Sequence, residues 1–256
     1  MIIEFSILIL RVNSAMSSDL MFNHWVERNV KPHKKSGYRI VTLCIKETGI
    51  APGDVTDKQM ELVADLAEQY SFSELRISHE QNFVLTDIKL TDLYTVYKAC
   101  KNQRLATPYV GLLNDMICCP GGDFCALANA KSRPIAESIQ RRFDDYDKLA
   151  NIGDITLNIS GCMNACGHHH VGNIGIIGVD KKGAEFYQVA LGGAADHNAQ
   201  LAKILGPAFA QEEIPDVIDK VINIYLDERE TGETFLATYN RIGMAPFKER
   251  VYAKAN

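Results

Sequence analysis

Four cysteines in two closely spaced pairs are the residues of this sequence best suited to chemistry. The first pair is Cys119 and Cys125, and the second is Cys162 and Cys166, with the spacings C-x5-C and C-x3-C. Four thiolates that converge on one point are what a cubane iron–sulfur cluster requires. Three histidines, residues 168–170, follow the second pair almost directly. The sequence therefore predicts a redox metal centre.

Three interpretations compete for these cysteines. They could be buried thiols without a metal, ligands of a structural zinc ion, or ligands of an iron–sulfur cluster. Zinc sites usually use shorter C-x2–4-C spacings, so the five-residue gap of the first pair is long for zinc. Glycines beside both pairs favour the cluster, because they let backbone amides approach and donate to sulfur. These glycines are Gly121, Gly122, Gly161 and Gly167.

The composition of the 256 residues is that of an ordinary soluble globular protein, with 46% apolar and 23% charged residues. The net charge of −5 argues against nucleic acid as a partner. The seven cysteines are an odd number, and their pairing fits metal ligation in a reducing compartment, so we expect a cytoplasmic protein. Cys44 and Cys100 have apolar neighbours and are expected in the core, whereas Cys118 has no clear role.

The amino-terminal residues do not resemble a membrane or secretion signal. The apolar stretch at residues 7–10 is too short to span a bilayer, and the cationic start of a secretory signal is missing. We expect residues 1–21 to form an irregular leader that is weakly structured or non-native. No other segment resembles a membrane helix, so a membrane is not expected as a partner.

The elements that would position the cysteines fall into two regions. In residues 22–106 we expect a strand at 39–45, a helix opened by a capping box at Thr56 and Gln59, strands at 75–78 and 83–88, and a helix at 91–102. This β-α-β-β-α order predicts a ferredoxin-like subdomain, with a small antiparallel sheet and helices on one face.

Residues 107–256 contain both cysteine pairs and read as an α/β domain, which makes the whole chain α+β. We expect a helix at 128–143 that Pro134 kinks or breaks. A strand at 155–160 leads to Cys162, and a hairpin follows at 174–179 and 186–193 with a turn at 181–183. A helix is predicted at 213–230, with Pro215 in its first turn.

The cysteine motifs CCPGGDFC and SGCMNACGHHH together resemble the signature of the siroheme-dependent nitrite and sulfite reductases. The resemblance extends over about residues 22–230 and includes the stretches ELRISHEQNFVL and VGNIGIIGVDKKGAEFYQVALGG. It implies that Cys119, Cys125, Cys162 and Cys166 hold a 4Fe–4S cluster. It also implies that Cys166 bridges the cluster to siroheme iron, so that residues 107–256 are a 4Fe–4S and siroheme-binding domain.

The activity implied by the resemblance is the reduction of sulfite to sulfide or of nitrite to ammonia. Both substrates are small anions, and the sequence does not choose between them. Electrons would come from ferredoxin or a flavoprotein subunit. Members of the family are longer and have two pseudo-symmetric halves, of which this chain resembles the second. We therefore also expect a missing amino-terminal half, as in a truncated gene, a fragment or a split enzyme. The alternatives are a cofactor-binding half without independent activity and an iron–sulfur electron carrier.

Further cofactor-binding residues follow from the same resemblance. Arg76, His79, Gln81 and Asn82 form a polar run that resembles a cofactor-facing strand, although a solvated strand edge would look the same. We expect Asn164 to shape the loop between the cysteines, and His168 and His169 to line the cofactor cavity without binding iron. A basic run, Lys31, His33, Lys34 and Lys35, could meet siroheme carboxylates or could be a solvated face.

Overall fold

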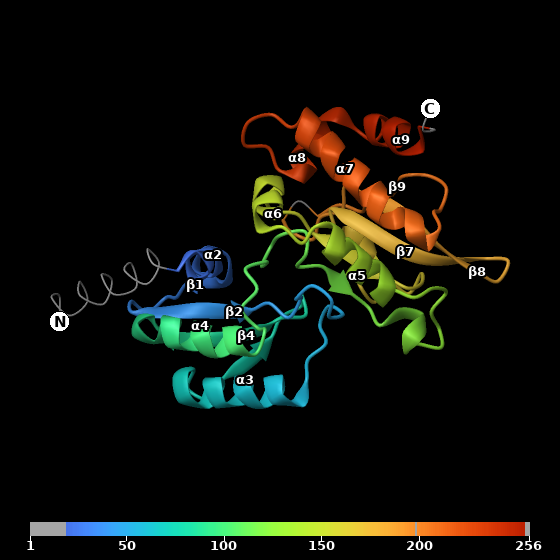
Figure 1. Cartoon of the computed structure of the whole chain (residues 1–256). Coiled ribbons are helices and arrows are strands. Elements are labelled where there is room, and N and C mark those ends of the chain that lie inside the picture. Colours follow the sequence, from blue (N-terminus) through green and yellow to red (C-terminus); the bar gives the residue numbers. More distant parts are fainter. Residues whose placement is uncertain (1–18, 198, 254–256) are drawn as a thin grey trace. The chain divides into compact units, whose positions relative to one another are not determined.

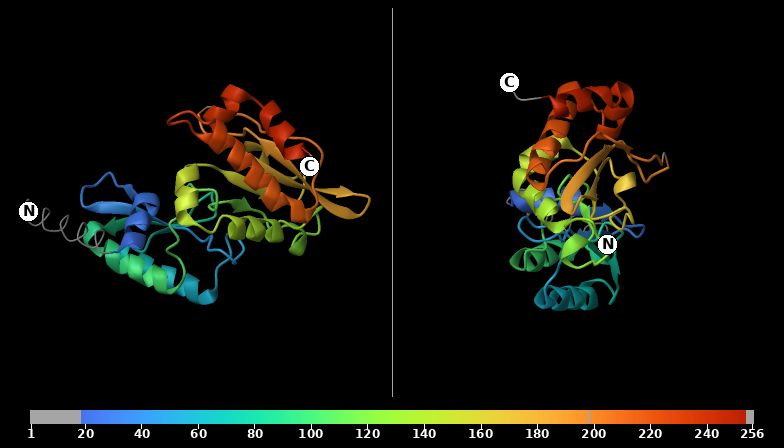
Figure 2. Two further views of the ribbon diagram at one scale, coloured as in Figure 1. Left: turned by 45° about the horizontal axis from the view of Figure 1, so that its top comes forward. Right: turned by 90° about the vertical axis from the view of Figure 1, so that its right-hand side faces the viewer.

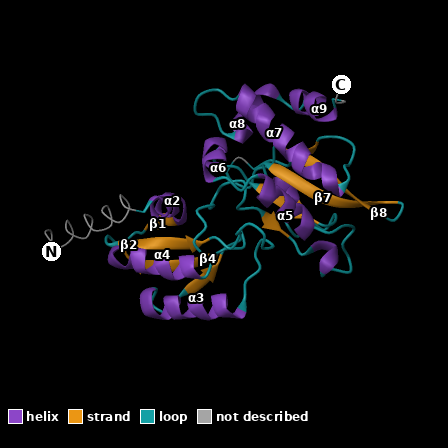
Figure 3. Cartoon of the chain, in the orientation of Figure 1, coloured by secondary structure: helices purple, strands orange, loops and turns teal. Residues whose placement is uncertain are grey.

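The computed structural model describes residues 19–197 and 199–253, which form two compact units. Unit 1 contains the described residues up to Glu47 and Gly53–Val110, and unit 2 contains Thr48–Pro52 and the described residues from Gly111 onward. Each unit combines helices with a sheet (Figure 3). The predicted α+β class is therefore confirmed. The predicted boundary between residues 106 and 107 stays a prediction.

The expected leader lies mostly outside the described residues. Its last three residues are described, and they are not irregular. Asp19 caps helix α2 (Leu20–Asn29) by accepting a hydrogen bond from the Phe22 N–H at 3.1 Å. The helix therefore includes Leu20 and Met21.

Unit 1 has a four-stranded antiparallel sheet with the order β1-β2-β4-β3. The strands are β1 (Val30–Pro32), β2 (Tyr38–Leu43), β3 (Leu75–Ile77) and β4 (Phe83–Lys89). Besides α2, the unit contains α3 (Asp57–Tyr70), a 3-10 turn η1 (Leu90–Asp92) and α4 (Leu93–Asn102), and α3 and α4 lie along the sheet (Figure 1). The strands and helices predicted for this region are all present, and helix α2 and the edge strand β1 are additional.

The capping box predicted at the start of α3 is present. The Gln59 N–H donates to Thr56 Oγ1 at 3.2 Å, and the Thr56 N–H donates to Gln59 Oε1 at 2.9 Å. These two bonds satisfy backbone donors that a helix start otherwise leaves without partners.

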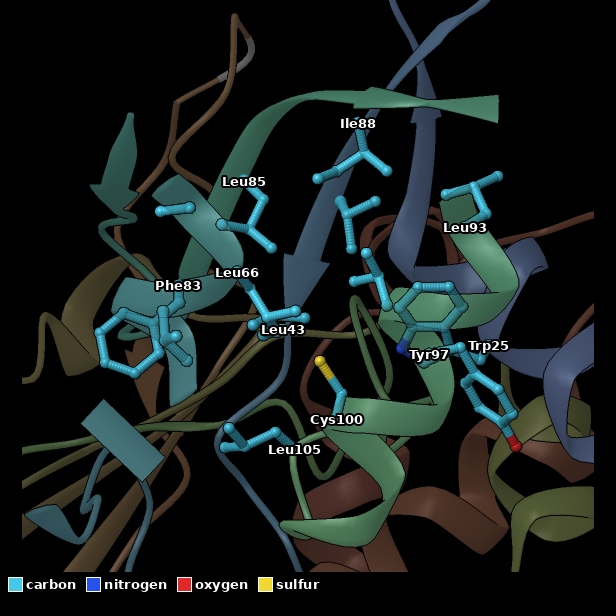
Figure 4. Close-up of a cluster of buried hydrophobic side chains, with 14 of the residues drawn as sticks. Trp25, Leu43, Leu66, Phe83, Leu85, Ile88, Leu93, Tyr97, Cys100 and Leu105 are labelled. Atoms are coloured by element: carbon cyan, nitrogen blue, oxygen red, sulfur yellow. The ribbon is translucent and has the colours of Figure 1, made fainter. Parts of the chain in front are cut away.

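The core of unit 1 is apolar and rich in aromatic side chains (Figure 4). Trp25 is completely buried, and its ring centroid lies 5.3 Å from that of Tyr97. Cys100 is buried beside Leu43 and Leu105, as the sequence predicts. Helices α2 and α4 are therefore fixed to the sheet mainly by apolar burial.

Unit 2 has a five-stranded mixed sheet with the order β5-β6-β7-β8-β9. The strands are β5 (Ile117–Cys118), β6 (Leu157–Ser160), β7 (Ile174–Lys181), β8 (Ala184–Leu191) and β9 (Lys203–Ile204). β5, β6 and β7 run parallel, whereas β8 is antiparallel to both of its neighbours. The predicted hairpin is β7–β8, a long twisted ribbon in both views of Figure 2, and its turn has positive φ at Lys182 and Gly183.

The longer helices of unit 2 support this sheet. They are α5 (Arg133–Arg142), α6 (Tyr146–Ile152), α7 (Ile214–Glu228), α8 (Phe235–Ile242) and α9 (Ala245–Tyr252), with short 3-10 turns η2 (Gly121–Asp123), η3 (His169–Val171) and η4 (Gln211–Glu213). α5 packs beside α7 (Figure 1), and ion pairs join Arg142 to Asp216 and Asp219. α7 matches the helix predicted at 213–230.

The predicted helix at 128–143 is wrong in its first part. Helix α5 starts at Arg133, and Pro134 lies in its first turn, where a residue without an N–H is tolerated. Residues 128–132 form a loop instead, because the N–H groups of Asn129 and Ala130 donate to the carbonyl of Gly161. Pro134 therefore starts the helix and does not kink it.

None of the helices that the structure describes is long and apolar enough to cross a bilayer.

Candidate metal centre

Two of the predicted cysteine ligands follow the carboxyl ends of neighbouring parallel strands. Cys119 comes directly after β5, and Cys162 follows β6 by two residues. The strands pair in the register Cys118 to Ile159, and the Cys119 N–H donates to the Ile159 carbonyl at 3.1 Å. The carboxyl edge of a parallel sheet is where α/β proteins commonly bind ligands. The topology thus brings the two cysteine motifs to one edge.

The first cysteine loop depends on a glycine. Gly121 has a φ of +60°, and a Cβ there would lie 2.4 Å from the Ser132 backbone nitrogen. The Cys125 N–H donates to the Gly121 carbonyl at 2.9 Å, which folds the loop around η2. Cys119 is buried and Cys125 is half-buried. Gly121 is needed here for both its positive φ and its lack of a side chain.

Direct hydrogen bonds join the first loop to the start of the second. The Gly161 N–H donates to Cys119 Sγ at 3.1 Å, and the Gly161 carbonyl accepts from Asn129 and Ala130 at 2.8 and 3.0 Å. A Cβ on Gly161 would lie 2.6 Å from the Ala130 carbonyl oxygen and 2.9 Å from Gly121 Cα. The loops that carry Cys119, Cys125 and Cys162 are therefore packed against each other.

The second cysteine loop folds back onto the end of β6. The Gly167 N–H donates to Ser160 Oγ at 3.1 Å, and a Cβ on Gly167 would lie 2.0 Å from the Ile159 carbonyl oxygen. Ala165 has a φ of +57°, a conformation that is uncommon for a residue with a side chain. Within this loop Cys162 is buried and Cys166 is exposed. Asn164 is exposed as well.

The three histidines follow as a turn and not as a strand. The His168 carbonyl accepts from Asn158 Nδ2 at 3.0 Å, and η3 begins at His169. A Cβ on Gly175 would lie 2.0 Å from the His169 carbonyl oxygen, so β7 holds this turn closely.

The imidazole of His169 has an unusual environment. Its Nδ1 atom is buried and has no hydrogen-bond partner among the residues that the structure describes. Burial lowers the pKa of His169, and the neighbouring His170 lowers it further. The ring is therefore predominantly neutral at neutral pH, and its buried nitrogen is available to an additional group.

The donor set fits a thiolate-bound cluster. All seven cysteines are free thiols. In the described part of the chain, no three His, Cys, Asp or Glu side chains are grouped so that they could hold one metal ion. A cubane does not require such a group, because each of its irons takes a different cysteine. The Gly161 amide on Cys119 Sγ is the type of hydrogen bond that tunes the potential of a cluster.

The candidate residues of unit 1 divide into exposed and buried groups. Arg76 is exposed and pairs with Glu74, with Nε and Oε1 2.6 Å apart, and His79 is exposed as well. Gln81 is half-buried with a φ of +58°, and Asn82 is 1% exposed. The predicted polar run is therefore a strand followed by a turn.

The basic run at β1 is mostly exposed. Lys31, Lys34 and Lys35 are exposed, and half-buried His33 faces Asp87, with Nε2 and Oδ1 3.3 Å apart. The exposed lysines and the His33–Asp87 pair are consistent with a solvated face, which was the alternative interpretation of this basic run.

Sequence reasoning missed the polar residues that hold the loops. Ser160 and Ser132 contact the cysteine loops, and Asn158 contacts the histidine turn. In unit 1 it missed Lys46, which is buried against the turn of Gln81 and Asn82. The polar Asn158 and Ser160 within the apolar strand β6 are a signal that could have revealed two of these residues.

Comparison with known families identifies both parts of the chain. Residues 111–256 match the family model described as the nitrite and sulphite reductase 4Fe-4S domain. Residues 32–103 match the model described as the nitrite/sulfite reductase ferredoxin-like half domain. The ferredoxin-like class predicted for the first region is thereby confirmed.

Individual relatives agree with this assignment. The chain is 29% identical over 203 residues to sulfite reductase (ferredoxin) 2 of Mycolicibacterium paratuberculosis, covering 75% of this chain and 36% of that protein. It is 28% identical over 220 residues to ferredoxin–nitrite reductase of Synechococcus elongatus, covering 82% and 40%. The chain thus spans two fifths or less of the length of these curated relatives.

Two solved structures have a similar fold. The NirA protein of Mycobacterium tuberculosis matches with a TM-score of 0.72 at 26% identity, covering 86% of this chain and 41% of that one. Dissimilatory sulfite reductase I matches with a TM-score of 0.69 at 14% identity, covering 86% and 70%. At that identity the second match shows a shared fold alone.

Proposed function

The chain belongs to the nitrite and sulfite reductase family, and from this premise we propose that it binds a 4Fe–4S cluster and siroheme and takes part in reducing sulfite to sulfide, with nitrite as the alternative substrate. The 4Fe–4S cluster and siroheme predicted from the sequence are the cofactors of the family. Relatives named as sulfite reductases and as nitrite reductases match equally well, so the substrate is decided by the experiment below.

One observation carries the proposal. The Gly161 N–H donates to Cys119 Sγ at 3.1 Å, at the point where the two cysteine loops pack together. An amide directed at a sulfur stabilises a thiolate, which is the form that binds iron. A thiol that served only for packing would not need this donor or the two close glycine contacts around it.

We assign the cluster to Cys119, Cys125, Cys162 and Cys166. Cys166 is the proposed bridge to siroheme, and its exposure supports this role because a second group can reach its sulfur. When bound, the coupled cluster and siroheme supply electron storage beside an iron site for a small anion. The chain's own part is to fix the four sulfurs and to keep the loop amides directed at them.

We also propose the siroheme-contacting residues in each unit. In unit 2 they are Asn164, His168 and His169, and the buried, unpartnered Nδ1 of His169 supports its inclusion. In unit 1 they are Arg76, His79, Gln81 and Asn82. Exposed Arg76 and His79 are suited to meet the carboxylates of an anionic cofactor.

We propose ferredoxin as the electron donor, because the names of the sulfite and nitrite reductase relatives specify it. A flavoprotein subunit is the alternative. A second candidate function is a cofactor-binding half that is active only with a further polypeptide, which the limited coverage of the relatives favours. That polypeptide would supply the cationic groups that bind the substrate and deliver protons.

Anaerobic reconstitution of the full chain with iron, sulfide and siroheme tests these functions. We expect haem absorption bands coupled to a cluster, followed by oxidation of reduced methyl viologen with sulfite or nitrite. Comparing the two turnover rates identifies the substrate. Coupled bands without turnover would support the second candidate function, a cofactor-binding half. Turnover should then appear when the further polypeptide is added. Broad cluster absorbance without haem bands would contradict the siroheme proposal and indicate an electron carrier.

A further inference from the structure

Lys46 is a completely buried lysine in unit 1, and the proposed function does not yet use it. It lies three residues beyond the end of β2 and is 0% exposed. Moving an ammonium group out of water is costly unless the protein provides hydrogen-bond acceptors in good geometry. A methionine of similar length would fill the same space without that cost. The choice of a lysine therefore needs a reason in its contacts.

Three acceptors surround the Lys46 ammonium group. Its Nζ lies 2.7 Å from the Glu80 carbonyl oxygen, 3.2 Å from the Gln81 carbonyl oxygen and 2.7 Å from Asn82 Oδ1. An ammonium group has three N–H donors, which matches this number of acceptors. All three acceptors belong to the turn that joins β3 to β4, residues 78–82. One side chain thus holds three successive residues of one turn.

The turn needs such support. Gln81 has a φ of +58°, which costs energy for a residue other than glycine and persists only where the surroundings enforce it. The turn is closed by the Ser78 N–H on the Asn82 carbonyl at 2.8 Å and by the Gln81 N–H on the Ser78 carbonyl at 3.1 Å. The Ile45 N–H also donates to Asn82 Oδ1 at 3.2 Å. Ile45 and Lys46 together tie the turn to the segment after β2.

The turn presents the residues that are proposed to contact siroheme. His79 is exposed and Gln81 is half-buried, while Asn82 is turned inward to Lys46. We infer that Lys46 is a positioning residue that fixes the 78–82 turn in the conformation that lets His79 and Gln81 bind siroheme carboxylates. Asn82, whose Oδ1 accepts a hydrogen bond from Lys46, is then also part of this support. The inference rests on the proposed siroheme function and refines it for unit 1.

The variant Lys46→Met tests the inference, because it keeps the length of the side chain and removes its charge and its donors. We expect the affinity of the full chain for siroheme, titrated into the cluster-loaded protein, to fall at least tenfold. Iron content and cluster absorbance should stay at wild-type values, because the four proposed cluster cysteines belong to unit 2. The visible circular dichroism of the siroheme that still binds should change, since it reports how the cofactor is held.

Hydrogen exchange and a control variant separate positioning from general stability. Hydrogen exchange of the Ser78 and Gln81 amides in the cofactor-free variant should be faster than in the wild type, while amides of α3 keep their protection. The matched control is Lys58→Met, an exposed lysine on α3, which should change none of these readouts. If Lys46→Met does not fold, Lys46→Gln keeps two donors on a shorter side chain and should bind siroheme with intermediate affinity.

The outcomes distinguish this inference from the proposed function. Wild-type siroheme affinity and dichroism in a folded Lys46 variant would overturn the inference and leave the proposed function intact. If the wild-type chain binds no siroheme, the proposed function fails. In that case, unchanged amide exchange in the variant would overturn the positioning role as well, and faster exchange would support it for the turn alone.

Discussion

Cys100 in unit 1 and Cys166 in unit 2 are the same residue type in opposite surroundings. Cys100 is completely buried in the apolar core, and burial raises the pKa of its thiol to about 12. Cys166 is exposed on a loop of unit 2. The thiolate is the form that binds iron, so a raised pKa disfavours ligation by Cys100. The comparison teaches that an apolar core keeps a thiol protonated, whereas the proposed ligands lie in loops where a backbone amide can reach sulfur, as that of Gly161 reaches Cys119.

The two units also differ in how they hold these cysteines. Unit 1 surrounds Cys100 with apolar side chains, such as Leu43 and Leu105, which can adjust to a small change in volume. Unit 2 holds its cysteine loops through backbone hydrogen bonds and close glycine contacts, such as those of Gly161. A backbone contact at 2.6 Å leaves no space for an added methyl group. We therefore expect the cysteine loops to be far less tolerant of substitution than the core of unit 1.

Removing one cysteine from each unit gives the largest contrast. Cys162→Ala takes a buried thiolate from the proposed cluster, and we expect the iron content to fall from about four per chain to near zero. Cys100→Ala, the matched control, should keep all of its iron. Elemental analysis and the absorbance of the cluster measure both. Equal iron content in the two variants would contradict the division of the cysteines into core thiols and ligands.

Adding one methyl group at Gly161 tests the difference in tolerance. In Gly161→Ala the new Cβ meets the Ala130 carbonyl and Gly121 Cα, so the two cysteine loops have to separate. We expect a loss of about 3 kcal/mol in the free energy of unfolding, together with most of the cluster. Urea unfolding and cluster absorbance measure these two effects.

Gly153→Ala is the control for Gly161→Ala in the same unit. Gly153 follows α6 with a φ of +83°, and a Cβ there meets nothing within 4 Å. It should cost only the strain of a side chain in a backbone region that glycine alone normally adopts, about 2 kcal/mol, and should keep the cluster. If Gly161→Ala behaves like Gly153→Ala, the close approach of the loops is not essential for the cluster.

Much of the fold could be predicted because the elements follow local rules. The capping box at Thr56 and the turn of the β7–β8 hairpin depend on neighbouring residues in the sequence, and both are present. The start of α5 could not be predicted in this way. The amides of Asn129 and Ala130 bind Gly161, which is far away in the sequence, and this contact removes them from a helix.

The candidate site shows the same limit. The spacing of the four cysteines was sufficient to predict a cluster, because spacing is a property of the sequence. The supporting role of Lys46 was not predictable, since this residue acts on a turn more than thirty positions later in the chain. A lysine in a sequence is normally read as a surface residue, so its complete burial could only be seen in the structure.

The smallest expected effect is the contribution of Cys100 to the pH dependence of the free energy of unfolding. Its thiol has a raised pKa in the folded chain, so above pH 9, the ordinary value, the unfolded chain has lost a proton that the folded chain still holds. The contribution of the protonated Cys100 thiol to the free energy of unfolding is therefore fully present below pH 9, and it is lost as the pH rises toward 12. Cys100→Ala should cost about 1 kcal/mol at pH 7 through lost packing, and this difference from the wild type should shrink by about 1 kcal/mol between pH 8.5 and 10. Urea unfolding of both proteins across this range measures the difference, and other groups that titrate there cancel because both proteins contain them. A difference that stays constant with pH would mean that Cys100 ionises as easily in the folded chain as in the unfolded one, and that burial does not raise the pKa of its thiol.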